Sequence, residues 1–449
     1  MAAISKAERV LEPSKISMSK EDFMLRLLRR STCQILVTVM GLSGLVGHAA
    51  FAQAPLTLPE ATAEAIAKNP EIQVLQQRLE VASARAKQAP YLEDPEIALQ
   101  LFAVPFSQPT NLNQADNTSV GIRQKLPFFG KLGLKEKIAQ QETRVADQEL
   151  QAKEREIISM VKMAYADLFM SQRSIEILRE QLDIMKTIIG ATESRYRVGR
   201  VTQQDVFKAQ LEQSELLNQL IVAEEDSNAA TVKLNTAMYR SPRTPIQVAA
   251  DLTLPELTST AAGLDELALA NRPELKGAEE EITRSEKMYE LADRNRKFPD
   301  FMVGWDYVRK PTEANKDRYA AMVNITIPFS PWTIGRRNYE VEESLAEIRA
   351  ARSNRDAVRN ATLKQVGESL SKVQAAKRSV QLYREGLLSQ AELSFRSALA
   401  AYQTGRVEFV NLLEAQRALR DARMGYYKAT VSYLQNVAEL ERAVGRELQ

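Results

Sequence analysis

Two short stretches of this chain are similar to each other: residues 196–210 read YRVGRVTQQDVFKAQ, and residues 402–416 read YQTGRVEFVNLLEAQ. In each stretch a glycine follows a tyrosine by three residues, at Gly199 and Gly405. Glycine adopts the left-handed backbone conformation that ends one helix before the next begins. Each stretch is therefore predicted to be the turn of a helical hairpin, and its recurrence indicates an internal duplication.

The prolines indicate how far the helices around these turns extend. None occurs between Pro127 and Pro242, and none after Pro331. Because proline lacks a backbone N–H and clashes with the preceding turn, proline-free runs favour long helices. A single helix over residues 131–196 would be about 100 Å long. Heptad spacing in both runs is typical of helices that pack against one another, and its positions are Ile157, Val161, Ala164, Leu168, Ile175, Leu178, Leu182, Met185 and Ile189, then Leu363, Val366, Leu370, Val373, Val380, Tyr383 and Leu387.

The segments that contain the prolines are also repeated. Asn69-Pro70-Glu71-Ile72 is similar to residues 271–275, and Pro127-Phe128 is similar to Pro328-Phe329. We therefore predict two repeats, 53–255 and 256–449, each with a short helix, a strand pair and a long helical hairpin. The strand pairs are expected at about 97–126 and about 300–327, and the hairpins at 131–241 and 335–447.

The predicted strands alternate apolar and polar residues, which is the period of a β-strand. A soluble antiparallel sheet would show the same alternation, so periodicity alone leaves that alternative open. Two observations favour strands that cross a bilayer. Each is about 9–10 residues long, which spans the hydrocarbon when tilted. Four strands cannot close a barrel, and lipid does not tolerate an open edge, so several chains would share one.

The N-terminal residues 1–52 are predicted to be a secretory signal peptide. Arg26, Arg29 and Arg30 precede an uncharged run over residues 35–54, within which Ala50-Phe51-Ala52 has the small-x-small pattern of a cleavage site. The alternative is a transmembrane helix, but three glycines interrupt the run and leave it short of the required ~20 apolar residues. A start at Met24 would give a signal peptide of more usual length.

Composition argues against catalysis and against a metal or nucleic-acid site. The only cysteine and the only histidine, Cys33 and His48, would both leave with the signal peptide. Catalytic triads, Cys–His pairs and Cys/His zinc sites are then excluded. A glycosidase with two carboxylates stays formally open, but nothing in the sequence indicates one. The net charge of +2 is too balanced to indicate a nucleic-acid partner. We therefore predict no enzyme and no cofactor.

Taken together, the signal peptide, the duplicated strand pair, the very long helices and the Tyr-x-x-Gly turns resemble the TolC-like outer membrane factor family. The resemblance covers essentially the whole chain after the signal peptide. It implies a mainly α fold with a small β part, in which three chains share a 12-stranded outer-membrane β-barrel that continues as an α-helical barrel. The stretch Gln124–Lys131 is most similar to the heavy-metal, CzcC-like or CusC-like, branch.

The resemblance also implies a function and a set of partners. The chain would be a passive, water-filled exit duct of a tripartite efflux system, lying in the outer membrane of a Gram-negative bacterium and extending into the periplasm. It would be a homotrimer that docks to a periplasmic adaptor (membrane fusion protein) and an inner-membrane pump, and it would carry metal cations or small molecules. The alternatives are a periplasmic coiled-coil scaffold or adaptor, and a type I secretion duct for polypeptides.

Counting from the turn glycines transfers the gate residues of the family to this chain. Two acids six and nine residues beyond the second glycine form rings at the periplasmic mouth in the family, and they correspond here to Asn411 and Glu414. The resemblance further implies a hydrogen bond between Tyr402 and Asp205 that joins the two coiled coils. A second link uses an arginine at the position of Val407, so it is not expected here.

Each of these residues also has a simpler interpretation. Thr202 and Asp205 have the spacing of a capping box, so Asp205 would cap its own helix. Glu414 would be an ordinary solvated helix residue. Four residues of the turns would contact the adaptor or would merely suit helix termini, and they are Gly199, Arg200, Gly405 and Arg406.

Overall fold

The structure is a computed structural model that describes residues 55–104, 106–107, 115–249, 252–310 and 317–448. The predicted signal peptide, residues 1–52, lies outside the described residues.

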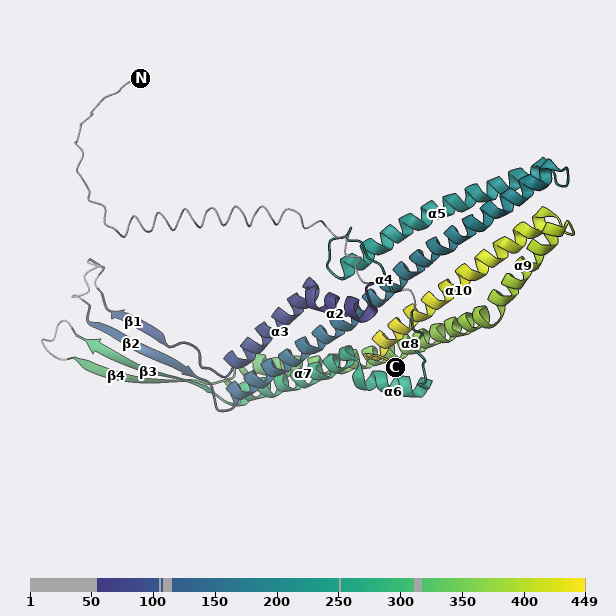
Figure 1. Cartoon of the computed structure of the whole chain (residues 1–449). Coiled ribbons are helices and arrows are strands. Elements are labelled where there is room, and N and C mark those ends of the chain that lie inside the picture. The colour runs from purple at the N-terminus through teal and green to yellow at the C-terminus, as the bar shows by residue number, and fades with distance from the viewer. Residues whose placement is uncertain (1–54, 105, 108–114, 250–251, 311–316, 449) are drawn as a thin grey trace, which may run out of the picture. The chain divides into compact units, whose positions relative to one another are not determined.

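Long helices dominate the chain, as the proline-free runs predicted (Figure 1). Helix α4 is a single helix of 67 residues, which corresponds to about 100 Å. In the second half, a five-residue π-helical turn connects α8 to α9. The bounds of the long elements are α4 (Lys131–Arg197), α5 (Gln203–Ala237), α8 (Ile334–Leu382), η3 (Tyr383–Leu387), α9 (Leu388–Thr404) and α10 (Phe409–Val444).

The two hairpin turns have the same backbone structure. Gly199 and Gly405 both have positive φ angles, +70° and +77°. Each glycine N–H donates to the carbonyl of the tyrosine three residues earlier, at 2.9 Å. The next N–H, of Arg200 or Arg406, donates to a carbonyl five residues back, also at 2.9 Å. This is the Schellman motif, which satisfies the last carbonyls of a helix and requires a residue that tolerates positive φ.

Each half begins with two helices, where the sequence predicted one short helix. The first pair is α2 (Leu58–Lys68) and α3 (Pro70–Gln88), and the second is α6 (Ala261–Asn271) and α7 (Pro273–Lys297). In both pairs a proline starts the second helix, and the residue before it is extended, with ψ of 122° and 119°. Proline disfavours the helical conformation of the preceding residue, so each helical segment is divided in two.

Four antiparallel strands form one sheet in the order β1-β2-β3-β4. The central pairing, β2 with β3, joins the two halves of the chain. The register places apolar residues on one face, because Ile97 pairs with Ile122, Ile122 with Trp305, and Val303 with Val323. This face is exposed in the single chain; Ile97, for example, is 81% exposed. The strands are β1 (Glu96–Phe102), β2 (Asn117–Leu126), β3 (Asp300–Arg309) and β4 (Arg318–Thr326).

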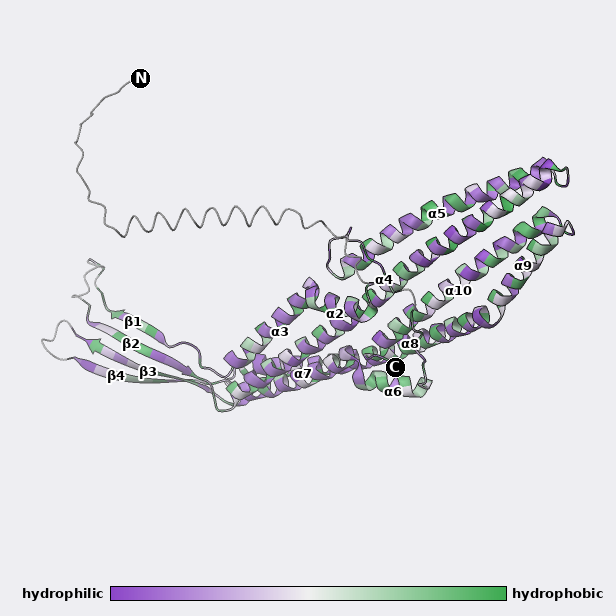
Figure 2. Cartoon of the chain, in the orientation of Figure 1, coloured by the Kyte–Doolittle hydropathy of each residue, from purple (hydrophilic) through white to green (hydrophobic). Residues whose placement is uncertain are grey.

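The helices pack side by side, so that α4 lies between α5 and α10, and α10 also packs against α8 and α9. Figure 2 shows polar and apolar residues intermixed along every long helix, as amphipathic packing requires. Among the described residues, no helix combines the length and apolarity needed to cross a membrane. The fold class predicted from the sequence is confirmed: mainly helical, with four antiparallel strands and two repeated halves.

Candidate functional site

The tips of the two helical hairpins lie at the same end of the long helices (Figure 1). One apolar cluster joins them, with members from α4, α5, α9 and α10. Tyr402 is at its centre and only 2% exposed, and its ring meets that of Phe409 edge to face at 5.9 Å between centroids. Because the gate residues inferred from the family resemblance all lie on these tips, this end of the molecule is the candidate functional site.

Tyr402 connects α9 to α4. Its hydroxyl lies 3.0 Å from Oγ1 of Thr192, which is buried and donates to the carbonyl of Ile188 at 2.8 Å. Since the threonine proton is engaged there, the tyrosine hydroxyl is the donor to Thr192. The guanidinium of Arg195 lies over the tyrosine ring, 4.7 Å from its centroid, and donates to the Tyr402 carbonyl. Three contacts therefore hold one tyrosine against the first hairpin.

Asp205 has different partners from those that the family resemblance implies. Its carboxylate accepts from the backbone N–H of Thr202 at 3.1 Å and from the Thr202 hydroxyl at 3.0 Å. These bonds form the capping box at the start of α5. In this conformation Tyr402 and Asp205 are thus each bonded to another residue. The described chain does not contain the phenol–carboxylate bond.

Asn411 and Glu414 are exposed on α10, one helical turn apart. Arg417 follows after another three residues, so the three side chains share one face of the helix. Within the described chain, the Glu414 side chain is exposed rather than part of the apolar cluster. Both a gate residue and an ordinary solvated helix residue would be exposed in this way. The turn residues Gly199, Arg200, Gly405 and Arg406 are also exposed.

A set of polar contacts between the hairpins was not predicted from the sequence. Gln416 donates to Gln181 at 2.8 Å, and both side chains are buried. Glu212 has no exposed surface and is bound by Arg417 and Arg420. This contact with Glu212 raises the pKa of the Arg417 guanidinium. The available sequence signal was that Glu212 occupies a core heptad position between Ala209 and Leu216.

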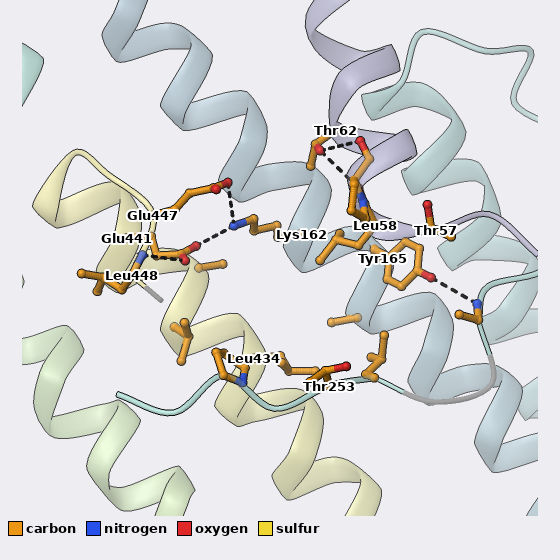
Figure 3. A pocket seen from close by; sticks show the side chains of 17 residues that line it. Thr57, Leu58, Thr62, Lys162, Tyr165, Thr253, Leu434, Glu441, Glu447 and Leu448 are labelled. Carbon is orange, nitrogen blue, oxygen red and sulfur yellow. Dashed lines mark hydrogen bonds and ion pairs between the residues drawn. The ribbon is translucent and has the colours of Figure 1, made fainter. Parts of the chain in front are cut away.

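A separate cavity of about 580 Å³ lies between α2, α4 and α10 (Figure 3). At one end Lys162 pairs with Glu441 at 2.7 Å and with Glu447 at 3.5 Å. At the other end the Tyr165 hydroxyl donates to the Leu56 carbonyl and accepts from a backbone N–H. Lys162 and Tyr165 thus bond to other groups of the chain itself, and the remaining lining is mostly apolar.

Residues 55–104, 106–107, 115–249, 252–310 and 317–448 contain no cluster of three or more His, Cys, Asp or Glu side chains arranged to hold a metal ion. If metal cations are the cargo, the described part of the chain offers them no such binding cluster.

The chain is similar to several known proteins. It is 22% identical over 396 residues to the cobalt-zinc-cadmium resistance protein CzcC of Cupriavidus metallidurans, a match that covers 88% of this chain and 91% of CzcC. The crystal structure of CusC superimposes with a TM-score of 0.72 at 16% identity, covering 87% of this chain and 92% of CusC. The outer membrane protein VceC of Vibrio cholerae gives a TM-score of 0.69 at 19% identity, with 87% and 97% covered.

The family assignment rests on both halves of the chain. Residues 61–238 and 264–446 each match the family described as outer membrane efflux protein. The two matched segments correspond to the two repeated halves of the chain. The structures that superimpose on the chain include the outer-membrane channel OprN. The chain therefore belongs to the outer membrane efflux protein family, whose members are non-enzymatic channels of the outer membrane that extend into the periplasm.

Proposed function

We propose that this chain is the exit duct of a tripartite efflux system, and that three copies form the channel. The observation that carries the proposal is the sheet, which has an exposed apolar face and open edges at β1 and β4. An open strand edge is not tolerated in lipid, so the sheet must pair with other copies. Two copies would supply eight strands, and side chains fill the interior of an eight-stranded barrel. Three copies would make a wider barrel that leaves room for water.

Aromatic residues support the position of the membrane boundary. Phe129 and Trp332 lie just before α4 and α8 begin, close to the ends of strands β2 and β4. They are 86% and 84% exposed. Aromatic side chains concentrate at both interfaces of outer-membrane barrels. These two residues therefore suit the level of the lipid head groups, with the strands in the membrane and the long helices in the periplasm.

The outer helices support closure into a ring. Because α4 and α10 lie in the middle of the helical layer, α5 forms one flank and α8 with α9 forms the other. Both flanks carry large exposed apolar residues, Phe207, Leu211 and Ile221 on α5, and Leu382 and Leu393 on α8 and α9. Contact between the unlike flanks of neighbouring copies is heterologous, and such contacts form rings when the rotation closes.

The proposed gate and docking sites are the residues of the hairpin tips. Three copies of Glu414 around the channel axis would focus a negative field at the mouth. Asn411 lies one helical turn closer to the tip of the hairpin. Tyr402 and Asp205 belong to the same gate, now with Thr192 as the observed partner of the tyrosine. The exposed turns at Gly199, Arg200, Gly405 and Arg406 would contact the periplasmic adaptor, which an inner-membrane pump feeds.

Metal cations are the proposed cargo, with other small molecules as the alternative. The printed name of CzcC, cobalt-zinc-cadmium resistance protein, supports this choice. A negative mouth suits cations. A type I secretion duct would use the same architecture for polypeptides. Expression with the matching adaptor and pump should lower cobalt, zinc or cadmium accumulation in cells, and unchanged accumulation of all three would argue against this cargo.

The duct is tested by planar-bilayer recording of the detergent-purified protein, with its mass measured in parallel. We expect a trimer that forms ion-conducting channels. A folded protein that remains monomeric and produces no channels would contradict the proposal. Extraction of membranes with alkaline carbonate distinguishes the duct from a periplasmic scaffold or adaptor, because a peripheral scaffold is washed off whereas a membrane barrel stays.

A further inference from the structure

Glu212 is a fully buried carboxylate in the apolar cluster of the hairpin tips. Its side chain has no exposed surface. The Arg417 Nε donates to its Oε2 at 2.8 Å, and the Arg420 guanidinium donates to its Oε1 at 3.4 Å. The Arg417 guanidinium adds a second contact to Oε2. Both carboxylate oxygens are thus occupied by arginines of one helix, α10.

The presence of a buried charge at this position is not explained by a gain in folding stability. Burying an ion pair costs desolvation that its mutual attraction does not always offset, and apolar replacements are often as stable. An alanine or leucine, as at Ala209 and Leu216, would fill the same heptad position of α5. Where buried ion pairs are retained, fixing one arrangement of elements is their best-supported role.

The arrangement that Glu212 fixes is that of the two hairpins. It lies on α5, in the first hairpin, whereas Arg417 and Arg420 lie on α10, in the second. Helices α5 and α10 otherwise both pack against α4. Arg417 is one turn from Glu414 on the same face of α10. The ion pairs therefore connect the helix face that carries the proposed mouth residues directly to the other hairpin.

Other polar contacts also join the two hairpins: Arg195 donates to the Tyr402 carbonyl, and Arg423 pairs with Glu180 at 2.8 Å on the surface. The buried pair Gln416 and Gln181 makes one hydrogen bond, and within the described residues Nε2 of Gln181 and Oε1 of Gln416 have no partner. Tyr402 and Thr192 make one neutral hydrogen bond. Charge-assisted bonds are roughly twice as strong as neutral ones. Among these contacts, Glu212 is the carboxylate with no exposed surface.

We propose that Glu212, clamped by Arg417 and Arg420, is the latch that holds the second hairpin against the first and keeps the periplasmic mouth narrow. We call these three residues the Glu212 latch. The inference rests on the proposed function, because it presupposes a gated duct. Opening the mouth then requires the two hairpins to separate at this point, and Glu212 acts as a positioning residue for Glu414.

The test compares Glu212→Gln with the matched control Glu215→Gln in single-channel recordings. Gln keeps the shape and one acceptor but removes the charge, so the Arg420 side chain, which is 13% exposed, keeps only its contact with Asp421 among the carboxylates that it reaches here. Glu215 lies one turn away on the same helix and also contacts Arg417, at 3.4 Å, but it is half exposed, and exposed ion pairs contribute little. We expect Glu212→Gln to raise the open population roughly tenfold, whereas Glu215→Gln behaves like the wild type.

Two further variants keep the test decisive. Arg420→Gln removes the second partner of Glu212 and should also raise the open population. This variant tests the latch even if Glu212→Gln fails to assemble. The double variant should open no more than Glu212→Gln alone, because both changes break one contact. Trimer mass and circular dichroism identify variants that do not fold.

The outcomes separate the latch from the duct. Wild-type channels of low conductance that open in Glu212→Gln and Arg420→Gln, but not in Glu215→Gln, would support the latch. Equal conductance in all four proteins would overturn the latch and leave the duct standing. Absence of channels from folded wild-type trimers would overturn the proposed function, and the latch with it.

Discussion

The hydroxyl of Tyr402 on α9 hydrogen-bonds to Oγ1 of Thr192 on α4, at 3.0 Å and out of contact with solvent. This bond joins the end of one hairpin to the body of the other. A buried neutral hydrogen bond contributes about 1 kcal/mol, and an unpaired buried hydroxyl costs more. The pair is therefore a defined connection between the hairpins that single substitutions can break.

The first prediction is that Tyr402→Phe and Thr192→Val weaken the same connection. Each should lower the free energy of unfolding by about 1 kcal/mol and increase channel conductance. The double variant should be less destabilised than the sum of the two, since both remove one bond. Thermal unfolding followed by circular dichroism, with conductance in parallel, measures the coupling. Strictly additive effects would show that the two residues act separately.

The second prediction concerns Asp205, which caps α5 rather than contacting Tyr402. Asp205→Ala should cost about 1 kcal/mol, the usual value of an N-terminal cap. Combined with Tyr402→Phe, the effects should add within about 0.5 kcal/mol. Asp205→Asn and Thr202→Ala serve as controls for the cap. A strong coupling of Asp205 with Tyr402 would instead indicate that the phenol–carboxylate bond forms in the assembled channel.

The third prediction concerns the charge of the mouth. Glu414→Gln should reduce the preference for cations over anions, because it removes the acid retained from the two family positions. Asn411→Asp would add a second ring of acids and should strengthen blockage by divalent cations. Reversal potentials in a salt gradient and titration of the current with a divalent cation report these effects. Unchanged selectivity in both variants would place the two residues away from the conducting path.

The fourth prediction is a pH dependence that centres on Glu64 of α2. Arg240 donates to this carboxylate from the segment after α5, and Lys68 donates to it at 2.8 Å. The hydrogen bonds from Arg240, opposed by desolvation and aided by Lys68, lower the pKa of Glu64 to about 2. Because the folded-state pKa lies below the unfolded value, the stabilisation is complete above about pH 4.5 and is lost as the pH falls towards 2.

Glu64→Gln should therefore cost on the order of 2 kcal/mol at pH 7, and less at lower pH. The difference in melting temperature between the wild type and the variant should shrink between pH 4.5 and pH 2. The exposed Glu80→Gln on α3 is the control and should show little change across this range. A difference for Glu64→Gln that stays constant with pH would refute the ion pair as its cause.

Much of the fold was predictable from local sequence. The turn at Gly405 was predictable because glycine tolerates positive φ, and its observed φ is +77°. The length of α4 follows from the absence of proline and from heptad spacing. The strands follow from alternation of apolar and polar residues. The division of each leading helix at Pro70 and Pro273 also has a local cause, the restriction of the preceding residue.

The partners of polar side chains were decided only by the tertiary structure. Sequence spacing and family resemblance allowed Asp205 two partners, and folding placed it on Thr202 and Tyr402 on Thr192. The burial of Glu212 depends on how α4 and α5 pack against α10, whose arginines lie 205 and 208 residues away in sequence. Helix and strand formation depend on neighbours a few residues away, and the sequence alone therefore determined the elements and their duplication. Hydrogen bonds and ion pairs between hairpins depend on packing at close range, which periodicity does not encode, and so only the tertiary structure decided how the tips are held together.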